Sequence, residues 1–390
     1  MKRLMKKSIV FILSAALLLC SCHRTLPTLD SVYFTGSEDN ELAVLYLDGA
    51  TVQNVTVSSS VKVDQDVTVT VKVDQEAMEN LNKLRGTSYV VLPENAYSLS
   101  TTEVTIKAGS AVSTPVTVSI PDPSVLVEGT HYCLPLSVES TSTGMNVLEV
   151  SKHKFLTVSQ IISTKAALTG NPGGGYSGNN YFAVPSMVLN ESFYDMGQCT
   201  MECRVKMHEF YPASHNPGIA TVMGQEEKFL IRFGDISCDN DQIQIAGRGK
   251  SLTSKSHFSK DVWYHVAAVD DGNTITLYVN GEVEGVESSK GKGAINLGWD
   301  WEGGFCIGNS CGNRIMNGEL SEVRVWQRAL SVAELKANTC YVDPASEGLV
   351  IYWRFDKQEA DGSIKDVTGH GHSAVPAGPV SFVDIKCPDL

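Results

Sequence analysis

Basic residues are scarce in this chain. It has 31 lysines and arginines against 44 aspartates and glutamates in 390 residues, for a formal net charge of −13. Proteins that bind nucleic acid need clustered basic side chains to pair with phosphates, so nucleic acid is excluded as a partner. The Gly-x-Ser-x-Gly, His-Glu-x-x-His and phosphate-loop motifs are also missing, which removes the sequence basis for the common hydrolase, zinc-peptidase and nucleotide-binding sites.

Long apolar runs are absent after the first 22 residues. That first segment has a basic start, an apolar stretch over Ile9–Leu19 and a small-residue cleavage region, which is typical of a secretory signal. Its end, Leu19-Cys20-Ser21-Cys22, resembles a bacterial lipobox. The resemblance implies a signal peptide over 1–21, lipidation of Cys22 and a tether over 22–30. A plain signal peptide with a chance cysteine is the alternative.

Metal knuckles and disulfide frameworks are not evident either, because no Cys-x-x-Cys pair occurs. Cys199 and Cys203 fall on one face of an expected strand, which favours core packing. An even number of cysteines in an exported protein permits disulfides, but the spacing leaves the pairing open and favours buried free thiols. After the lipobox the cysteines are Cys133, Cys199, Cys203, Cys238, Cys306, Cys311, Cys340 and Cys387.

Residues 31–158 consist almost entirely of short apolar stretches with turn residues between them. In Val67–Val73 valine alternates with polar residues, which predicts a strand with one buried and one wet face. Gln75–Arg85 is the single helix expected here, with Ala77, Met78, Leu81 and Leu84 on one side. Turns every eight to twelve residues predict an immunoglobulin-like β-sandwich.

Three blocks in this region, Thr87–Leu99, Val104–Gly109 and Tyr132–Leu136, are similar to the N-terminal module of Bacteroidetes surface lipoproteins, the domain-of-unknown-function 1735 family. In that family the module lies between the lipid anchor and a glycan-handling domain, so the resemblance implies a spacer. Residues 159–168 are expected to be a linker to the second domain.

The remainder, 169–390, carries a second pattern. Trp263–Gly281 has apolar strands separated by an Asp-Gly turn and closed by Asn-Gly, which predicts antiparallel hairpins. In Gly318–Leu335 an alternating strand is followed by a helix with Ser331 as N-cap and Glu334 three residues later. With Gly348–Asp356 and Asp366–His372, these stretches resemble laminin-G-like modules. The resemblance implies a concanavalin A-like jelly-roll sandwich and an all-β chain.

Catalysis is not favoured by the acidic residues. Glycosidases of this fold use a Glu-x-Asp-x-x-Glu strand that sets two carboxylates on one face. The similar segment Glu282–Glu287 lacks the aspartate and contains Gly285. Glu226 and Glu227 are adjacent, so they would point to opposite faces of a strand. A glycoside hydrolase therefore stays the least favoured function.

Sugar binding requires an exposed aromatic ring with polar side chains nearby. Trp263, Trp326 and Trp353 lie on the signature strands and are expected in the core, whereas Trp299 and Trp301 lie in a glycine-bracketed loop. Two interpretations of this loop stay open: a sugar platform, or a cover for the sandwich edge. The polar and aromatic neighbours expected at the platform are Asp300, Asn309, Asn313, Arg314 and Tyr211.

Calcium is the one expected cofactor, since laminin-G-like modules sometimes bind it. Asp235, Asp239 and Asp241 lie close together between two expected strands, where they would supply oxygen ligands. The alternative is a polar hairpin turn, in which Asp and Asn are common. His370 and His372 flank Gly371 and are better explained by a surface turn than by a metal site.

Taken with the resemblances, these patterns predict a non-catalytic lipoprotein that binds glycan at the outer membrane, facing the cell surface. The periplasmic face is the alternative location. Other surface glycan-utilisation proteins are expected partners. An adhesin or complex subunit that binds protein through the laminin-G-like domain is the competing function.

Overall fold

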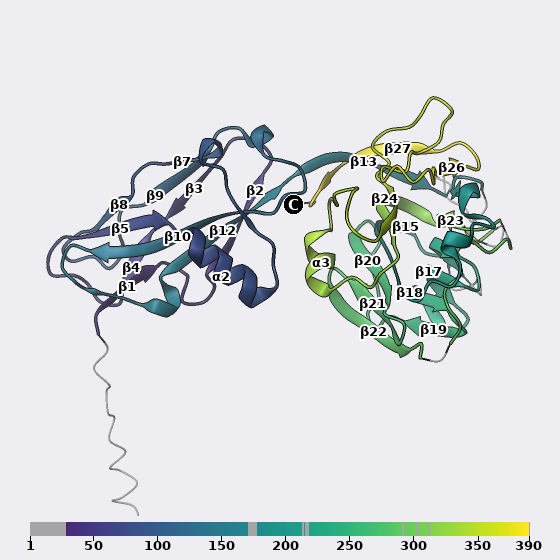
Figure 1. Cartoon of the computed structure of the whole chain (residues 1–390), viewed down its shortest axis with the longest axis horizontal. Coiled ribbons are helices and arrows are strands. Elements are labelled where there is room, and N and C mark those ends of the chain that lie inside the picture. Colours follow the sequence, from purple (N-terminus) through teal and green to yellow (C-terminus); the bar gives the residue numbers. More distant parts are fainter. Residues whose placement is uncertain are drawn as a thin grey trace, which may run out of the picture.

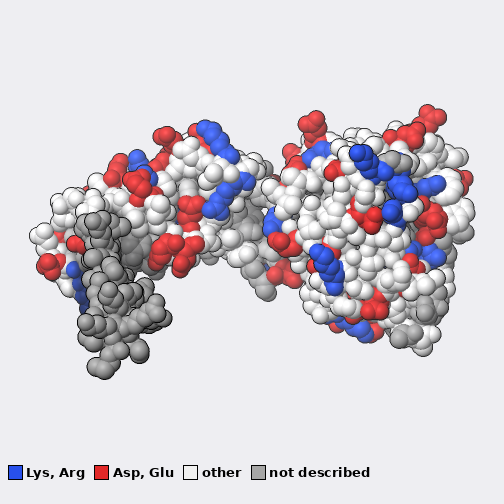
Figure 2. All heavy atoms as spheres, turned by 90° about the horizontal axis from the view of Figure 1, so that it is seen from below, with Lys and Arg blue, Asp and Glu red and all other residues white. Residues whose placement is uncertain are grey.

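The computed structural model describes residues 29–170, 178–212, 214, 218–290, 292–301, 303–310 and 313–389, and Figure 1 shows them arranged as two β-rich modules. Cys22, for which lipidation is expected, lies outside the described residues. Within the described part of the chain, no helix is long and apolar enough to cross a membrane. Acidic side chains are spread over both modules on the face drawn in Figure 2, with basic ones among them.

The N-terminal module has three sheets, with strand orders β11-β1-β4, β2-β12-β10-β5-β8 (β6 pairs with β10) and β3-β9-β7. They enclose one apolar core that contains Phe34, Val69 and Leu134. The elements are β1 (Ser31–Phe34), β2 (Leu42–Leu47), β3 (Thr51–Val55), β4 (Val57–Ser59), β5 (Val67–Val73), α2 (Gln75–Arg85), β6 (Val90–Val91), η1 (Glu94–Ala96), β7 (Ser98–Leu99), β8 (Glu103–Ile106), β9 (Val116–Ile120), η2 (Pro123–Val125), β10 (Tyr132–Thr141), β11 (Asn146–Val147), η3 (Glu149–Ser151) and β12 (His153–Gln160).

Helix α2 has the predicted bounds, and its caps explain them. The Asp74 carboxylate accepts from the backbone N–H of Ala77, and Gly86 ends the helix in the left-handed conformation at φ 65°. The helix packs its inner side on Cys133 and Phe155. Of the four apolar residues expected on one side, Ala77, Met78 and Leu81 are buried, whereas Leu84 is 83% exposed and does not share their packing.

The C-terminal module is a sandwich of two large sheets. The larger has the order β22-β21-β20-β15-β24-β13-β27, with β25 paired to β24, and the smaller has the order β19-β18-β17-β16-β23-β14-β26. Their inner faces share one core, which includes Met201, Phe233 and Leu277. The elements are β13 (Ile162–Thr169), β14 (Phe182–Ala183), η4 (Pro185–Met187), η5 (Glu191–Phe193), β15 (Cys199–Glu209), β16 (Ala220–Gln225), β17 (Phe229–Asp235), β18 (Cys238–Gly247), β19 (Lys250–Thr253), β20 (Trp263–Asp270), β21 (Thr274–Val279), β22 (Glu282–Ser288), β23 (Cys306–Ile307), β24 (Asn317–Trp326), α3 (Val332–Ala337), β25 (Leu349–Trp353), β26 (Val375–Pro376) and β27 (Ser381–Cys387).

The predicted hairpins and the capped helix are confirmed. Strands β21 and β22 are joined by Asn280-Gly281, whose φ angles are both positive, at 51° and 74°. Such turns match the twist of the strands that they connect. At the start of α3, Ser331 and Glu334 form a reciprocal capping box.

The core position expected for Trp263 is wrong. Trp326 and Trp353 are buried, but Trp263 is half-buried and its ring lies beneath the charged groups of Arg204 and Lys206, at 4.7 and 5.0 Å from its centroid. Successive residues of a strand point to opposite faces. Because Val266 points into the core, Trp263 must point to the outer face of the larger sheet.

The linker expected over 159–168 is also wrong, because this segment is mostly strand. Strand β12 ends at Gln160 and β13 begins at Ile162, so Ile161 alone separates the two modules. Two ion pairs join the modules beside this junction. Arg354 Nη2 donates to Glu128 Oε1 at 2.9 Å, and Lys386 Nζ donates to Asp48 Oδ2 at 2.5 Å.

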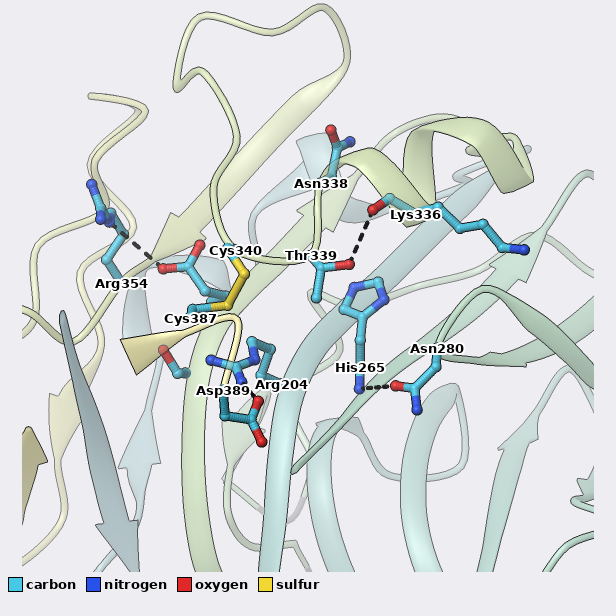
Figure 3. Close-up of a disulfide and its surroundings, with 12 residues drawn as sticks. Arg204, His265, Asn280, Lys336, Asn338, Thr339, Cys340, Arg354, Cys387 and Asp389 are labelled. Atoms are coloured by element: carbon cyan, nitrogen blue, oxygen red, sulfur yellow. Dashed lines mark hydrogen bonds and ion pairs between the residues drawn. A yellow bond between two sulfur atoms is a disulfide. The ribbon is translucent and has the colours of Figure 1, made fainter. Parts of the chain in front are cut away.

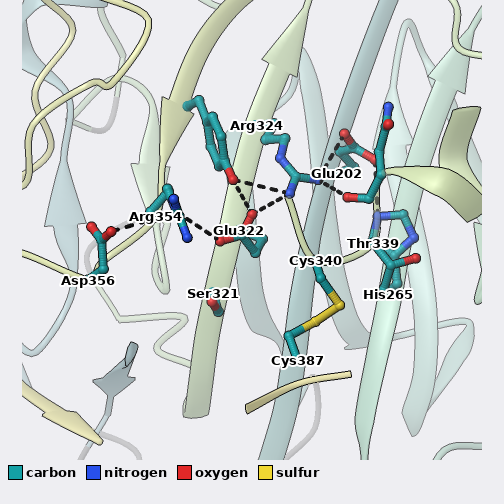
Figure 4. Close-up of polar contacts among 12 residues, drawn as sticks. Glu202, His265, Ser321, Glu322, Arg324, Thr339, Cys340, Arg354, Asp356 and Cys387 are labelled. Atoms are coloured by element: carbon teal, nitrogen blue, oxygen red, sulfur yellow. Dashed lines mark hydrogen bonds and ion pairs between the residues drawn. A yellow bond between two sulfur atoms is a disulfide. The ribbon is translucent and has the colours of Figure 1, made fainter. Parts of the chain in front are cut away.

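A charged network is buried on the outer face of the larger sheet, and Figure 4 shows its members. Arg324 lies between two carboxylates, donating to Glu202 Oε1 at 3.2 Å and also to Glu322. All three side chains are inaccessible to solvent. His265 lies 3.0 Å from Glu202 Oε2, and the Tyr352 hydroxyl donates to Glu322.

The two carboxylates titrate differently. Burial opposes ionisation of both groups. At Glu202, the charge of Arg324 and the hydrogen bonds from its neighbours overcome that burial and lower the pKa of the carboxyl. At Glu322, burial prevails and the pKa is raised.

A disulfide between Cys340 and Cys387 holds the end of β27 against the segment that follows α3 (Figure 3). Its Cα atoms are 5.4 Å apart, a usual spacing for a disulfide. Cys133, Cys199, Cys203 and Cys238 are free and buried, which confirms core packing for Cys199 and Cys203. Cys306 is buried as well. Cys311 lies outside the described residues.

Candidate functional site

The outer face of the smaller sheet carries a row of polar side chains where strands β16, β17 and β18 lie side by side. Thr221 pairs with Arg232, and Arg232 pairs with Gln244. On β17 the neighbouring Ile231 and Phe233 point into the core. Alternation along the strand therefore directs Arg232 to the opposite face.

Hydrogen bonds fix the Arg232 guanidinium in this row. Its Nε and Nη2 both donate to Gln244 Oε1, at 3.1 and 2.6 Å, and Nη2 also donates to Asp235 Oδ2 at 2.7 Å. The Gln244 amide in turn donates to Thr253 Oγ1 at 3.3 Å. Charge-assisted bonds of this kind hold a side chain in one orientation.

Glu226 extends the row at the turn between β16 and β17. Its buried carboxylate accepts from Ser310 Oγ at 2.6 Å and from Arg314 Nη1 at 2.5 Å. Arg232 Nη1 lies 3.7 Å away on the same carboxylate. A single acid thus joins two guanidinium groups that come from different segments of the chain.

The two loop tryptophans also contact this turn. Trp299 and Trp301 stack with their ring centroids 5.5 Å apart and their planes 25° apart. The Lys228 ammonium lies 3.4 Å above the Trp299 ring, and Gln225 Nε2 donates to the Trp301 carbonyl at 3.1 Å. Trp301 is 37% exposed, whereas Trp299 is half-buried. Trp301 therefore offers the more accessible ring.

We call this surface the tryptophan face. Its aromatic pair contacts Gln225 and Lys228 at the β16–β17 turn, and Arg314 bonds to Glu226 of the same turn. Three nominated residues, Trp299, Trp301 and Arg314, therefore meet one turn from a much earlier part of the chain. The tryptophan face consists of Gln225, Glu226, Lys228, Trp299, Trp301 and Arg314.

The other nominated residues have different surroundings. Asp300 and Asn313 are exposed. Asn309 is buried, and its Oδ1 accepts no hydrogen bond from the described residues, as is also true of Gln225 Oε1. Tyr211 is corrected: its ring is 4% exposed in the core and its hydroxyl donates to the Ile315 carbonyl, so it offers no face to a ligand.

The polar row itself was missed from the sequence, although a signal was present. Arg232 interrupts the apolar run Phe229–Phe233, and a charged residue inside such a run predicts a strand whose second face is not apolar. Glu226 was judged only by its neighbour Glu227. It lies in a tight turn rather than a strand, with Glu227 at φ 63°.

The calcium ligands are only partly brought together. Asp239 and Asp241 approach His257, whose Nδ1 lies 2.8 Å from Asp241 Oδ1. Asp235 does not join them, because it pairs with Arg232. Asp235 and Cys238 close a hairpin between β17 and β18, so the polar-turn interpretation is confirmed for that segment.

This donor set suits calcium poorly, because calcium prefers oxygen ligands. The hydrogen bond to Asp241 raises the pKa of His257, so an ion would also compete with a proton. We expect EDTA or added calcium to leave the midpoint of thermal unfolding unchanged. A calcium-dependent rise in the midpoint that disappears in Asp241→Asn, but persists in the control Asp235→Asn, would instead establish a cation site.

The acids of β22 are already engaged. Glu282 pairs with Lys336 at 2.6 Å, Glu284 accepts from Ser256, and Glu287 pairs with Lys250 at 3.0 Å. The bond to Lys250 lowers the pKa of Glu287. A general acid needs a raised pKa, so the lowered pKa of Glu287 does not suit that role.

His370 and His372 have separate partners. His370 Nδ1 lies 2.9 Å from the Val350 carbonyl, and His372 Nδ1 lies 3.0 Å from Ser186 Oγ. Neither histidine belongs to a group of three possible metal ligands within the part of the chain that the structure describes. These contacts fit the predicted surface turn.

Two packed sheets with this strand order define a concanavalin A-like module, and comparisons with known families agree. Residues 176–336 match the concanavalin A-like lectin/glucanases superfamily, and residues 28–145 match a family of N-terminal domains. The chain therefore combines an N-terminal domain of the domain-of-unknown-function 1735 type with a C-terminal laminin-G-like domain. No curated protein matches it.

Among solved structures, the chain is similar to a putative carbohydrate binding protein from Bacteroides ovatus. The identity is 25%, the TM-score is 0.56, and the match covers 90% of this chain and 97% of the other. A multidomain protein including domain of unknown function 1735, also from Bacteroides ovatus, has 13% identity, a TM-score of 0.29 and coverage of 76% and 96%. Only the first similarity is strong enough to support the fold over both modules.

Proposed function

We propose that the protein is a non-catalytic glycan-binding lipoprotein that captures polysaccharide or glycoprotein glycans at the cell surface for a glycan-utilisation system. The observation that carries this proposal is the tryptophan face. It presents an exposed ring, that of Trp301, next to a turn whose polar side chains are held by hydrogen bonds. The similarity to the putative carbohydrate binding protein from Bacteroides ovatus, over nearly the whole chain, supports it.

The chemistry of this surface suits a sugar ring. A pyranose has an apolar C–H side that packs on an aromatic ring, and hydroxyls at its edge that bond to amides and guanidinium groups. Arg314 is partly exposed and bonds to Glu226 of the same turn, so its guanidinium can supply donors to sugar hydroxyls at this surface. Gln225 and Asn309 are buried, so they support the surface from beneath and do not contact a ligand. Each such bond contributes only about 1 kcal/mol, so a single site would bind weakly.

Location and partners complete the proposal. Lipidation of Cys22 would hold the protein on the outer membrane, with the N-terminal module as a spacer. Weak individual sites are then compensated by many copies on one surface, because a polymeric glycan contacts several of them at once. Enzymes and a transporter that process the captured glycan would work beside it.

We expect Trp301→Ala to weaken glycan binding about tenfold, or about 1.4 kcal/mol. The reason is that the substitution removes the exposed ring of the pair. A glycan array should first identify a ligand for the full chain, and titration calorimetry should then compare the variants. Trp263→Ala is the matched control, because Trp263 is a half-buried tryptophan on the other sheet.

Equal affinity of Trp301→Ala and the unmodified chain would remove the tryptophan face as the site. Binding to matrix or neighbouring surface proteins, with no glycan bound, would overturn the proposed function in favour of an adhesin.

A further inference from the structure

A groove of about 700 Å³ lies between the two modules. In Figure 1, α3 is on the side of the C-terminal module that faces the N-terminal one. One wall consists of β2, the end of β12 and the loops at 86–89 and 129–131, and the other consists of α3 and the segment that follows it to Tyr341. The volume falls in the range of about 300–1,000 Å³ that is usual for sites of small ligands.

The N-terminal wall presents an aromatic ring beside hydroxyl groups. Val44 and Tyr46 point outward from β2, and Tyr46 is 45% exposed. Strand β12 pairs with β2 in parallel, which places Thr157 opposite Val44 and Ser159 opposite Tyr46 on the same face. Helix α2 covers another part of this outer face, at Phe155, and leaves the groove part open.

The C-terminal wall adds an amide, a hydroxyl and a second ring, from Asn338, Thr339 and Tyr341. Tyr341 is held in place where the two modules touch. The Arg354 guanidinium lies 5.1 Å from its ring centroid, and Gly129 packs so closely that a Cβ there would be 2.0 Å from the ring. Glycine at 129, with φ 78°, is therefore required for this contact.

Charge is almost absent from the lining. Its two ionic side chains already have partners outside the groove: Glu334 pairs with Arg328 at 2.8 Å, and Lys336 pairs with Glu282 at 2.6 Å. Burial lowers the pKa of His131, so this histidine is neutral near pH 7. The groove thus selects against strongly charged ligands, since they would find no free counter-charge.

The width of the groove is fixed by the structure around it. Ile161 alone connects β12 to β13, and Tyr341 of the C-terminal module packs closely on Gly129 of the N-terminal one. The Arg354–Glu128 and Lys386–Asp48 ion pairs add two more contacts between the modules. A preformed site needs no ordering on binding and so loses less affinity to conformational entropy.

We infer that this groove is a second carbohydrate-binding site, which takes a neutral oligosaccharide by stacking it on Tyr46 and bonding its hydroxyls to the Ser159, Asn338 and Thr130 side chains. The inference rests on the proposed function, because it assigns the same class of ligand to a separate place in the chain. It gives the N-terminal module a part in ligand binding that a spacer does not have.

Two substitutions test the groove directly in the full chain. Tyr46→Ala removes the exposed ring, and Thr130→Trp fills the space without removing a buried contact. Tyr33→Ala is the matched control, because Tyr33 is a half-buried tyrosine of the same module outside the groove. Titration calorimetry would use neutral glycan-array oligosaccharides, and hydrogen exchange would follow residues 86–89, 129–131 and 338–341.

Tyr46→Ala and Thr130→Trp should each weaken binding of a neutral oligosaccharide at least fivefold, and the ligand should slow exchange in all three segments, with Tyr33→Ala unchanged. Unaltered affinity in both groove variants, while Trp301→Ala loses binding, would overturn the groove and leave the proposed function intact. Binding of extended peptides alone, in register with β2, would overturn it as well. No glycan binding by the unmodified chain would overturn both proposals.

Discussion

Arg324→Met should lower the free energy of unfolding of the C-terminal module by about 3–5 kcal/mol. The substitution keeps the volume of the buried side chain but leaves Glu202 and Glu322 without their shared counter-charge. A buried carboxylate without a partner must lose its charge or expose itself to water. The pKa of Glu202 should therefore rise above its ordinary value in the variant, in contrast to its lowered value here.

Urea denaturation followed by tryptophan fluorescence measures this loss selectively. All five tryptophans lie in the C-terminal module, at positions 263, 299, 301, 326 and 353. Lys336→Met is the matched control: its pair with Glu282 is exposed, and such pairs contribute about 0–1 kcal/mol. If Arg324→Met lowered the free energy of unfolding by less than about 1 kcal/mol, water would be replacing the arginine as a partner of the two carboxylates. That result would contradict a network closed to solvent.

Replacing both Cys340 and Cys387 by alanine should destabilise the same module by about 4 kcal/mol. The disulfide closes a loop of 47 residues, and the chain-entropy relation gives this value for a loop of that length. The bond also holds β27, which lies at the edge of the larger sheet beside β13. In the double alanine variant, protection from hydrogen exchange should therefore be lost first in β27.

A thermal melt with and without reductant checks this prediction. Reductant should lower the midpoint of the unmodified chain toward that of the double variant and leave the variant unchanged. Exchange with the free thiols should not interfere, because Cys133 is buried and burial raises its pKa to about 12, which keeps the thiol protonated. If reductant had no effect on the unmodified chain, the disulfide would contribute nothing to its stability.

The sequence was most informative where structure depends on neighbouring residues. Helix α2 and the Asn280-Gly281 turn follow from capping and turn chemistry within a few residues, so both were predicted with their bounds. The position of Trp263 could have been predicted too. Alternation from Val266 places it on the outer face, whereas membership of a signature motif says nothing about which face it occupies.

The sequence could not predict which segments pack over the outer faces of the two sheets. Trp326 also points away from the sandwich core, yet it is buried because Leu335 of α3 and Leu349 pack over it. Nothing local distinguishes its surroundings from those of Trp263. Likewise, the tryptophan face depends on Glu226 meeting Ser310 and Arg314, 84 and 88 residues further along the chain. Contacts of that range are set by sheet topology, which a pattern of residues does not specify.

The one-residue junction at Ile161 has a consequence for how the chain engages a long polymer. Because the modules do not swing on a flexible linker, the groove and the tryptophan face have a fixed separation and direction. A polymer that binds both sites at once must therefore be long enough to reach from one to the other. Shorter oligomers occupy one site at a time and gain no affinity from the second. Affinity would then rise stepwise with polymer length, and that length would report the spacing of the two sites.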